Sequence, residues 1–71
     1  MVVPRKPPLH QFPQIQLQVA QAQAILGDDA RILLRYSGTE NLARVMIEGM
    51  DAGLVAREAQ AIARVIQETI N

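Results

Sequence analysis

The sequence contains no Cys and no Trp, only one Phe and one Tyr, and its seven basic and seven acidic side chains cancel. Without Cys it has neither disulfides nor thiolate metal ligands, and nothing indicates an oxidising compartment, so we expect a cytoplasmic protein. The charge balance argues against the broad positive field of a nucleic-acid or anionic-membrane binder. The few aromatic residues also argue against an RNA-binding α+β domain that stacks bases. We expect neither nucleic acid nor membrane as a partner.

Long apolar runs are also missing, since none approaches the ~20 residues needed to span a bilayer. The Pro-rich amino terminus has no signal-peptide stretch. With 71 residues, the chain is one small domain, too short to enclose a deep active site. Because 49% of residues are hydrophobic, a core built from aliphatic side chains is expected.

Residues 1–11 are predicted to form an extended, Pro-rich linker in which Val2 and Val3 are the end of a strand, leaving residues 12–71 as the folded domain. Proline fixes φ and removes a backbone donor, which favours extended structure around Pro4, Pro7 and Pro8. A Pro-rich basic segment is also found in ligands of small peptide-binding domains, a less common use than a linker.

Two hydrophobic periods compete between residues 12 and 27. Apolar residues at 15, 17 and 19 alternate with glutamines, as in a half-buried strand. A second set of apolar residues has helical spacing. The helix is favoured by the length of the segment, its Ala and Gln content, Pro13 in the first turn and Gly27 as a stop. The helical set is Ile15, Val19, Ala22 and Leu26.

Residues 31–36 and 42–50 are apolar and lie between turn signals, so we expect two strands in an antiparallel hairpin. Residues from Asp51 onward have helical spacing, with Asp51 as the amino-terminal cap. The expected apolar stripe is Val55, Ala59, Ile62 and Ile66, and the side chains expected mostly in solvent are Arg57, Glu58, Gln60, Arg64, Gln67 and Glu68. The predicted class is α+β, a small antiparallel sheet with two helices on one face in the order (β)-α-β-β-α.

The loop between the strands, residues 35–40, combines groups that bind anions. Arg35 presents a planar fork of donors that remains charged, and Ser37 and Thr39 add hydroxyl groups. At Gly38 an anion oxygen can approach the backbone N–H closely, and successive N–H groups of a turn form anion-binding concavities. The loop therefore predicts a phosphate site.

Two simpler readings of this loop stand beside that one. Residues 37–40 match a helix capping box, in which Ser37 and Glu40 bind the first free N–H groups. The following β-branched residues and Gly49 are a poor start for a helix, so an ordinary polar hairpin is the stronger alternative. His10, beside the linker, and Asp28-Asp29, in a turn, are interpreted as surface residues, and no metal site is predicted.

Residues 35–41, followed by Arg44-Val45-Met46-Ile47-Glu48-Gly49, resemble the phosphate-binding loop and next strand of the α-D-phosphohexomutase family. The order of elements is similar to that family's carboxy-terminal (TBP-like) domain, so the resemblance covers nearly the whole chain. Gly38 and the strand most resemble the phosphoglucosamine mutase branch, although the glucose and mannose branches share the loop. The resemblance implies that Arg35, Ser37, Gly38 and Thr39 hold the substrate phosphate and that Glu40 supports the loop.

The resemblance also implies a parent enzyme that moves phosphate between the 6- and 1-positions of a hexose through a bisphosphate. In such a parent, a phosphoserine and Mg²⁺ belong to other domains. We therefore expect no catalytic residue and no cofactor site in this chain. The chain alone should lack mutase activity. The implied partners are a phosphosugar and the remaining domains. The family usually has Pro where this chain has Asn41. The alternative function is a stand-alone regulatory module that binds another anion.

Overall fold

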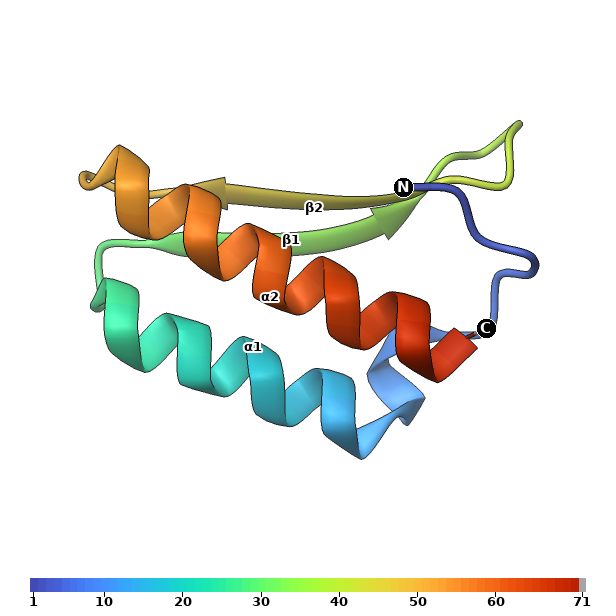
Figure 1. The fold of residues 1–71 in the computed structure, drawn as a ribbon, viewed down its shortest axis with the longest axis horizontal. Helices are drawn as coiled ribbons and strands as arrows, with labels where there is room; N and C mark the ends of the chain where they lie inside the picture. Colours follow the sequence, from blue (N-terminus) through green and yellow to red (C-terminus); the bar gives the residue numbers. More distant parts are fainter. Residues whose placement is uncertain (71) are drawn as a thin grey trace.

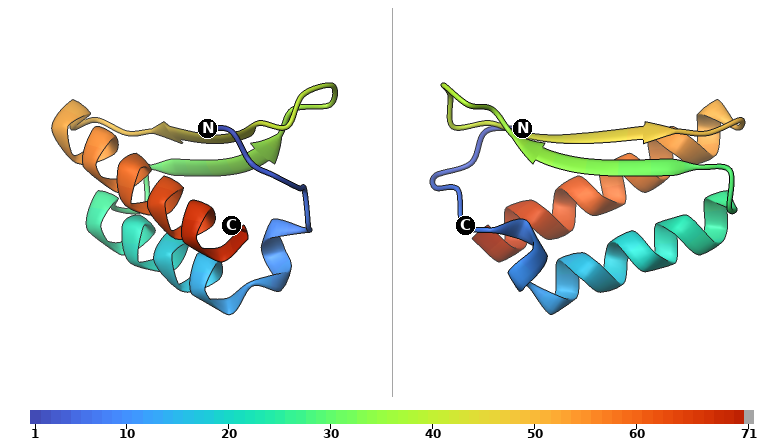
Figure 2. Two further views of the ribbon diagram at one scale, coloured as in Figure 1. Left: turned by 45° about the vertical axis from the view of Figure 1, so that its right-hand side comes forward. Right: turned by 180° about the vertical axis from the view of Figure 1, so that it is seen from behind.

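The computed structural model describes residues 1–70 as two layers, a β-hairpin and a pair of helices, within 31 × 23 × 15 Å. Both helices lie side by side against one face of the hairpin (Figures 1 and 2). The elements are η1 (Leu9–Gln11), α1 (Pro13–Leu26), β1 (Arg31–Tyr36), β2 (Ala43–Glu48) and α2 (Ala52–Ile70). The predicted fold class and order of elements are confirmed.

Helix α1 occupies the segment in which two periods competed. Pro13 is at its start, where the missing N–H costs nothing, and Gly27 ends it with a φ of 96°. Ile15 and Ala22 are buried, whereas Leu17, which belongs only to the strand pattern, is 60% exposed. The helical interpretation is therefore confirmed.

The hairpin pairs β1 and β2 antiparallel from Arg31 opposite Glu48 to Tyr36 opposite Ala43. Its inner face carries the partly or fully buried apolar residues that meet the helices, and its outer face carries the exposed ones. The outer residues, in register, are Arg31, Leu33 and Arg35 on β1 and Glu48, Met46 and Arg44 on β2. The loop between the strands lies at one end of the molecule (Figure 1).

The first residues of the chain pair with the outer edge of β2. Val2 forms an antiparallel bridge with Leu42, and the N–H of Val3 donates to the Asn41 carbonyl at 2.8 Å. The N–H of Ala43 donates to the Met1 carbonyl, also at 2.8 Å. Val3 is 1% exposed and Leu9 is buried, so this segment contributes to the core as well as to the sheet edge.

Helix α2 begins after Asp51, whose Oδ1 accepts the N–H of Leu54 at 3.1 Å, as expected of a cap. One expectation for this helix was wrong: Glu58 is 4% exposed rather than in solvent. Residues four apart lie on one face of a helix, and Glu58 heads the row of buried residues Ile62, Ile66 and Ile70. Its Oε2 pairs with Arg57 Nε at 3.0 Å, which offsets the cost of burying a carboxylate.

No helix within residues 1–70 is long and apolar enough to cross a membrane.

Candidate functional site

A hollow of about 160 Å³ lies at the loop end of the hairpin, lined by Arg35, Tyr36, Ser37, Gly38 and Arg44. At about 30 Å³ per water molecule, it holds on the order of five water-sized atoms. A phosphate group has five heavy atoms, whereas a hexose phosphate is much larger. The hollow therefore has room for an anionic group of the size of phosphate.

Arg35 and Arg44 are directly opposite each other in the hairpin, and both are exposed on its outer face. Like charges in directly opposed positions of an antiparallel pair destabilise it. Within residues 1–70 neither guanidinium has an acidic partner within ion-pair distance. Two unneutralised arginines at one end of a short hairpin are the arrangement that a bound dianion would stabilise.

The loop itself is organised around the hydroxyl oxygen of Ser37. This oxygen accepts the N–H groups of Thr39 at 3.4 Å and Glu40 at 3.3 Å, both long hydrogen bonds. The pattern is the first half of a capping box, but a strand follows instead of a helix, so the helix-cap alternative is wrong. The Ser37 O–H remains free to donate, and the N–H of Gly38 has no acceptor among the described residues.

Gly38 does not need to be glycine for backbone reasons. Its φ is not positive, and a Cβ added to it would meet nothing within 4 Å. The missing side chain leaves room for a group outside the chain to approach the backbone N–H of Gly38 closely. Asn41, which stands where the family usually has Pro, does not use left-handed geometry either, because none of the described non-glycine residues has a positive φ.

Residues 5–7 form hydrogen bonds to the end of β1, to the loop and to the end of α2. Lys6 Nζ donates to the Ser37 carbonyl at 2.8 Å, and the Tyr36 hydroxyl donates to the Pro7 carbonyl. Arg5 Nε donates to the Ile70 carbonyl at 3.3 Å, at the end of α2. Burial raises the pKa of the Tyr36 hydroxyl above its usual value, and the positive charge of Arg5 partly offsets this shift. Tyr36 is thus a neutral donor at physiological pH.

Of the five residues predicted from the sequence, the structure brings Arg35, Ser37 and Gly38 together in the hollow. Thr39 and Glu40 do not line it, and their N–H groups are turned toward Ser37. Sequence reasoning missed Arg44. Counting outward from the predicted strand ends, 36 and 42, places Arg35 opposite position 43, one residue away from the observed partner Arg44.

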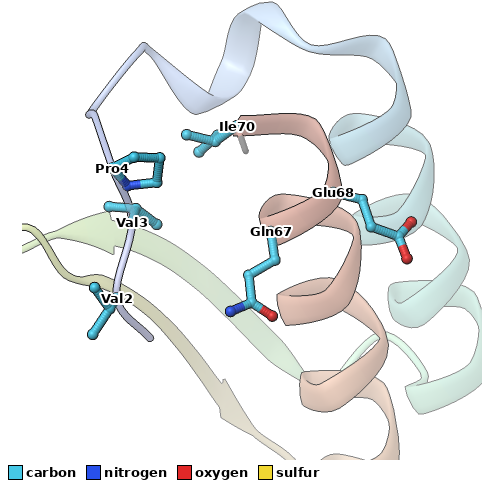
Figure 3. Close-up of a pocket in the computed structure, with 6 residues that line it drawn as sticks. All are labelled: Val2, Val3, Pro4, Gln67, Glu68 and Ile70. Atoms are coloured by element: carbon cyan, nitrogen blue, oxygen red, sulfur yellow. The ribbon is translucent and has the colours of Figure 1, made fainter.

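A second hollow, of about 290 Å³, lies between the amino-terminal segment and the end of α2 (Figure 3). Val3 and Pro4 face Ile70 there, and Glu68 points away from them (Figure 3). The charged and polar side chains do not converge, so this hollow lacks the features of a binding site. In residues 1–70 no three His, Cys, Asp or Glu side chains are grouped so as to hold a metal.

These features define a small α+β domain that presents an arginine-rich, glycine-containing turn at one end of a hairpin. The chain belongs to the family of phosphoglucomutase/phosphomannomutase carboxy-terminal domains, whose model matches residues 1–65.

Several curated proteins are similar in sequence to nearly the whole chain. The chain is 46% identical over 68 residues to a phosphoglucosamine mutase of Solidesulfovibrio magneticus, covering 96% of this chain. It is 47% identical over 66 residues to that of Nitratidesulfovibrio vulgaris and 44% identical over 68 residues to that of Protochlamydia amoebophila, covering 93% and 96% of this chain. The chain spans about 15% of the length of these relatives. No solved structure gives a significant match.

Proposed function

We propose that the hollow binds the phosphate group of a hexose phosphate, and that the domain serves this purpose in a phosphoglucosamine mutase. The observation that carries the proposal is the pair of opposed arginines, Arg35 and Arg44, beside the free hydroxyl of Ser37 and the free N–H of Gly38. Two guanidinium groups, one hydroxyl and one backbone N–H belong to residues that line one small hollow, and each can donate to a bound phosphate.

The parent reaction is proposed from the relatives, which are phosphoglucosamine mutases by name. It would convert glucosamine 6-phosphate and glucosamine 1-phosphate into each other through a bisphosphate. A loop that binds only the phosphate accepts the intermediate in either orientation, because it does not contact the sugar. Binding energy at the distal phosphate would then orient the reacting end.

Other parts of such an enzyme would supply the remaining chemistry. The described residues do not fit a Mg²⁺ site, since they contain no cluster of acidic ligands, and no step of the proposal passes through a metal in this chain. We propose that the chain alone binds phosphate and has no mutase activity. Turnover of glucosamine 6-phosphate by the 71-residue chain would contradict this.

The test is a titration of the isotope-labelled chain, followed by backbone amide shifts. Glucosamine 6-phosphate and inorganic phosphate should both shift residues 35–39 and Arg44, with affinity of roughly millimolar strength because the enclosing domains are missing. Unphosphorylated glucosamine should leave these residues unshifted. Absence of shifts at the loop with either phosphate up to tens of millimolar would contradict phosphate binding by this chain.

Matched arginine variants sharpen the test. Arg35→Gln removes one of the opposed charges and should weaken phosphate binding about tenfold or more. Arg31→Gln removes a charge from the same strand and the same outer face, but Arg31 lies opposite Glu48, away from the hollow. It should leave the affinity within about twofold. If both variants weakened phosphate binding equally, the binding would be a nonspecific attraction of phosphate to positive charge and not a site.

A further inference from the structure

The peptide unit between Ser37 and Gly38 presents its two polar groups in opposite directions. A peptide bond is planar, and none among the described residues is cis, so the Ser37 carbonyl points away from the Gly38 N–H. The carbonyl accepts a hydrogen bond from Lys6 Nζ at 2.8 Å. Gly38 lines the hollow and its N–H has no acceptor among residues 1–70, whereas Lys6 does not line the hollow. A group that fixes the direction of this carbonyl therefore also fixes the direction of the Gly38 N–H.

The hairpin itself does not hold the Ser37 carbonyl. The N–H of Ser37 donates to the Leu42 carbonyl at 2.8 Å, and in a hydrogen-bonded pair of an antiparallel ladder the partner donates in return. Within residues 1–70 that return bond, from the Leu42 N–H to the Ser37 carbonyl, is not formed. The ammonium group of Lys6 is the donor that this carbonyl has in its place.

Glycine at position 38 leaves this peptide unit free to turn over. Inverting its plane changes ψ of Ser37 and φ of Gly38, and in β-turns the inverted central peptide requires a positive φ at the residue that follows it. Glycine accepts a positive φ without steric cost. The φ observed at Gly38 is not positive, so the structure shows the orientation in which the carbonyl is directed to Lys6.

The backbone around Lys6 is fixed on both sides. Arg5 Nε donates to the Ile70 carbonyl at 3.3 Å, and the Pro7 carbonyl accepts the Tyr36 hydroxyl. Because Lys6 precedes a proline, its own backbone is restricted to extended conformations. In residues 1–70 no acidic side chain lies within ion-pair distance of Lys6. Its ammonium group is therefore held at the loop without a competing carboxylate.

We propose that Lys6 is a positioning residue for the phosphate site: it holds the Ser37 carbonyl and so keeps the N–H of Gly38 directed into the hollow. The inference rests on the proposed function. A bound phosphate requires this orientation, because the inverted peptide would present a carbonyl oxygen to the anion instead of an N–H. The positive charge at the carbonyl also polarises the peptide unit, which strengthens its N–H as a donor.

Substitutions at two neighbouring residues test this role in the amide titration with inorganic phosphate. Lys6→Met removes the donor and should weaken phosphate binding about threefold to tenfold. Arg5→Met removes the same charge one residue away, but Arg5 bonds to the end of α2 and not to the loop, so the affinity should stay within about twofold. Lys6→Arg keeps a charged donor and should bind phosphate more tightly than Lys6→Met. Circular dichroism shows whether each variant folds.

A variant of Gly38 separates positioning from charge. Gly38→Ala disfavours a positive φ, so the peptide keeps its orientation without Lys6. Adding Lys6→Met to Gly38→Ala should therefore weaken binding by less than about twofold, although Lys6→Met alone weakens it more. The three-bond coupling between the N–H and the α protons of Gly38 reports its φ, and this coupling should change in the Lys6→Met chain before any phosphate is added.

The outcomes distinguish this inference from the proposed function. If the original chain binds phosphate and Lys6→Met binds it equally well, the positioning role is overturned and the phosphate site stands. Equal weakening by Lys6→Met and Arg5→Met also overturns the role, as does the same weakening by Lys6→Met with and without Gly38→Ala, because the effect is then one of charge. If the original chain binds no phosphate, the proposed function fails and the positioning role falls with it.

Discussion

Tyr36, at the end of β1, is connected to the amino-terminal segment through its hydroxyl group, which donates to the Pro7 carbonyl. Tyr36→Phe keeps the ring and removes only this bond. A hydrogen bond of this kind contributes about 0.5–1.5 kcal/mol, so the free energy of unfolding should fall by that amount. Urea unfolding at pH 7 measures it. An unchanged midpoint would show that the hydroxyl bonds equally well to water.

The same variant has a predicted pH signature. Burial raises the pKa of Tyr36 above its usual value of 10.0 in the folded chain. Below pH 10 the hydroxyl is protonated in both states and adds no slope. Above it the unfolded chain loses the proton more readily, so stability falls as pH rises toward the folded pKa. The difference between the original chain and Tyr36→Phe should therefore shrink as the pH rises above about 10. A constant difference would contradict the raised pKa.

The placement of single residues was predictable where it depends on neighbours in the sequence alone. Arg35, Ser37 and Gly38 carry donors within a few positions, and all three line the hollow. Arg44 was missed because its place depends on strand register, which composition does not reveal. Glu58 was assigned to solvent because it is charged. Its burial is set by the row Ile62, Ile66 and Ile70 and by the neighbouring Arg57, a balance that only packing decides.

At the scale of turns, Gly27 and Gly38 differ in whether the backbone conformation requires glycine. Gly27 has a φ of 96° and a ψ of 173°, a region open only to glycine, so Gly27→Ala should cost on the order of 1–3 kcal/mol. Gly38 has neither a positive φ nor neighbours within 4 Å of an added Cβ. Gly38→Ala should change the free energy of unfolding by no more than about 0.5 kcal/mol.

The effects of these two substitutions on phosphate affinity should have the opposite order to their effects on stability. Gly38 lines the hollow, so a methyl group at this position is expected to hinder the approach of an oxygen, and Gly38→Ala should weaken phosphate binding several-fold. Gly27 is at the end of α1, outside the residues that line the hollow. Gly27→Ala should bind normally wherever it remains folded. Thermal unfolding and the amide titration measure the two effects, and normal binding by Gly38→Ala would remove Gly38 from the site.

Helices and strands were predictable to different degrees. The capped, strongly amphipathic α2 follows from its spacing and Asp51, and α1 follows from length, Pro13 and Gly27 despite its competing period. The second strand was expected over residues 42–50, whereas β2 ends at Glu48. Gly49 and Met50 lie outside it because they lead into the cap of α2. Apolar character does not distinguish the last residue of a strand from the turn that follows.

The amino-terminal segment shows how the whole molecule depends on contacts far apart in sequence. Val3 is 1% exposed within the core cluster, and the neighbouring Val2 is 73% exposed although it has the same side chain. Such short segments have no period from which burial is predictable. Their place is set by pairing with residues some forty positions away, as in the bridge between Val2 and Leu42.

These two valines provide a matched test of whether the segment is part of the folding unit. Val3→Ala removes two buried methyl groups and should cost about 2 kcal/mol, including the space left behind. For a 71-residue chain with roughly 4–10 kcal/mol of total stability, the unfolding midpoint should fall clearly. Val2→Ala should have almost no effect. Equal, small effects in urea unfolding would mean that residues 1–3 detach from the core before the rest unfolds.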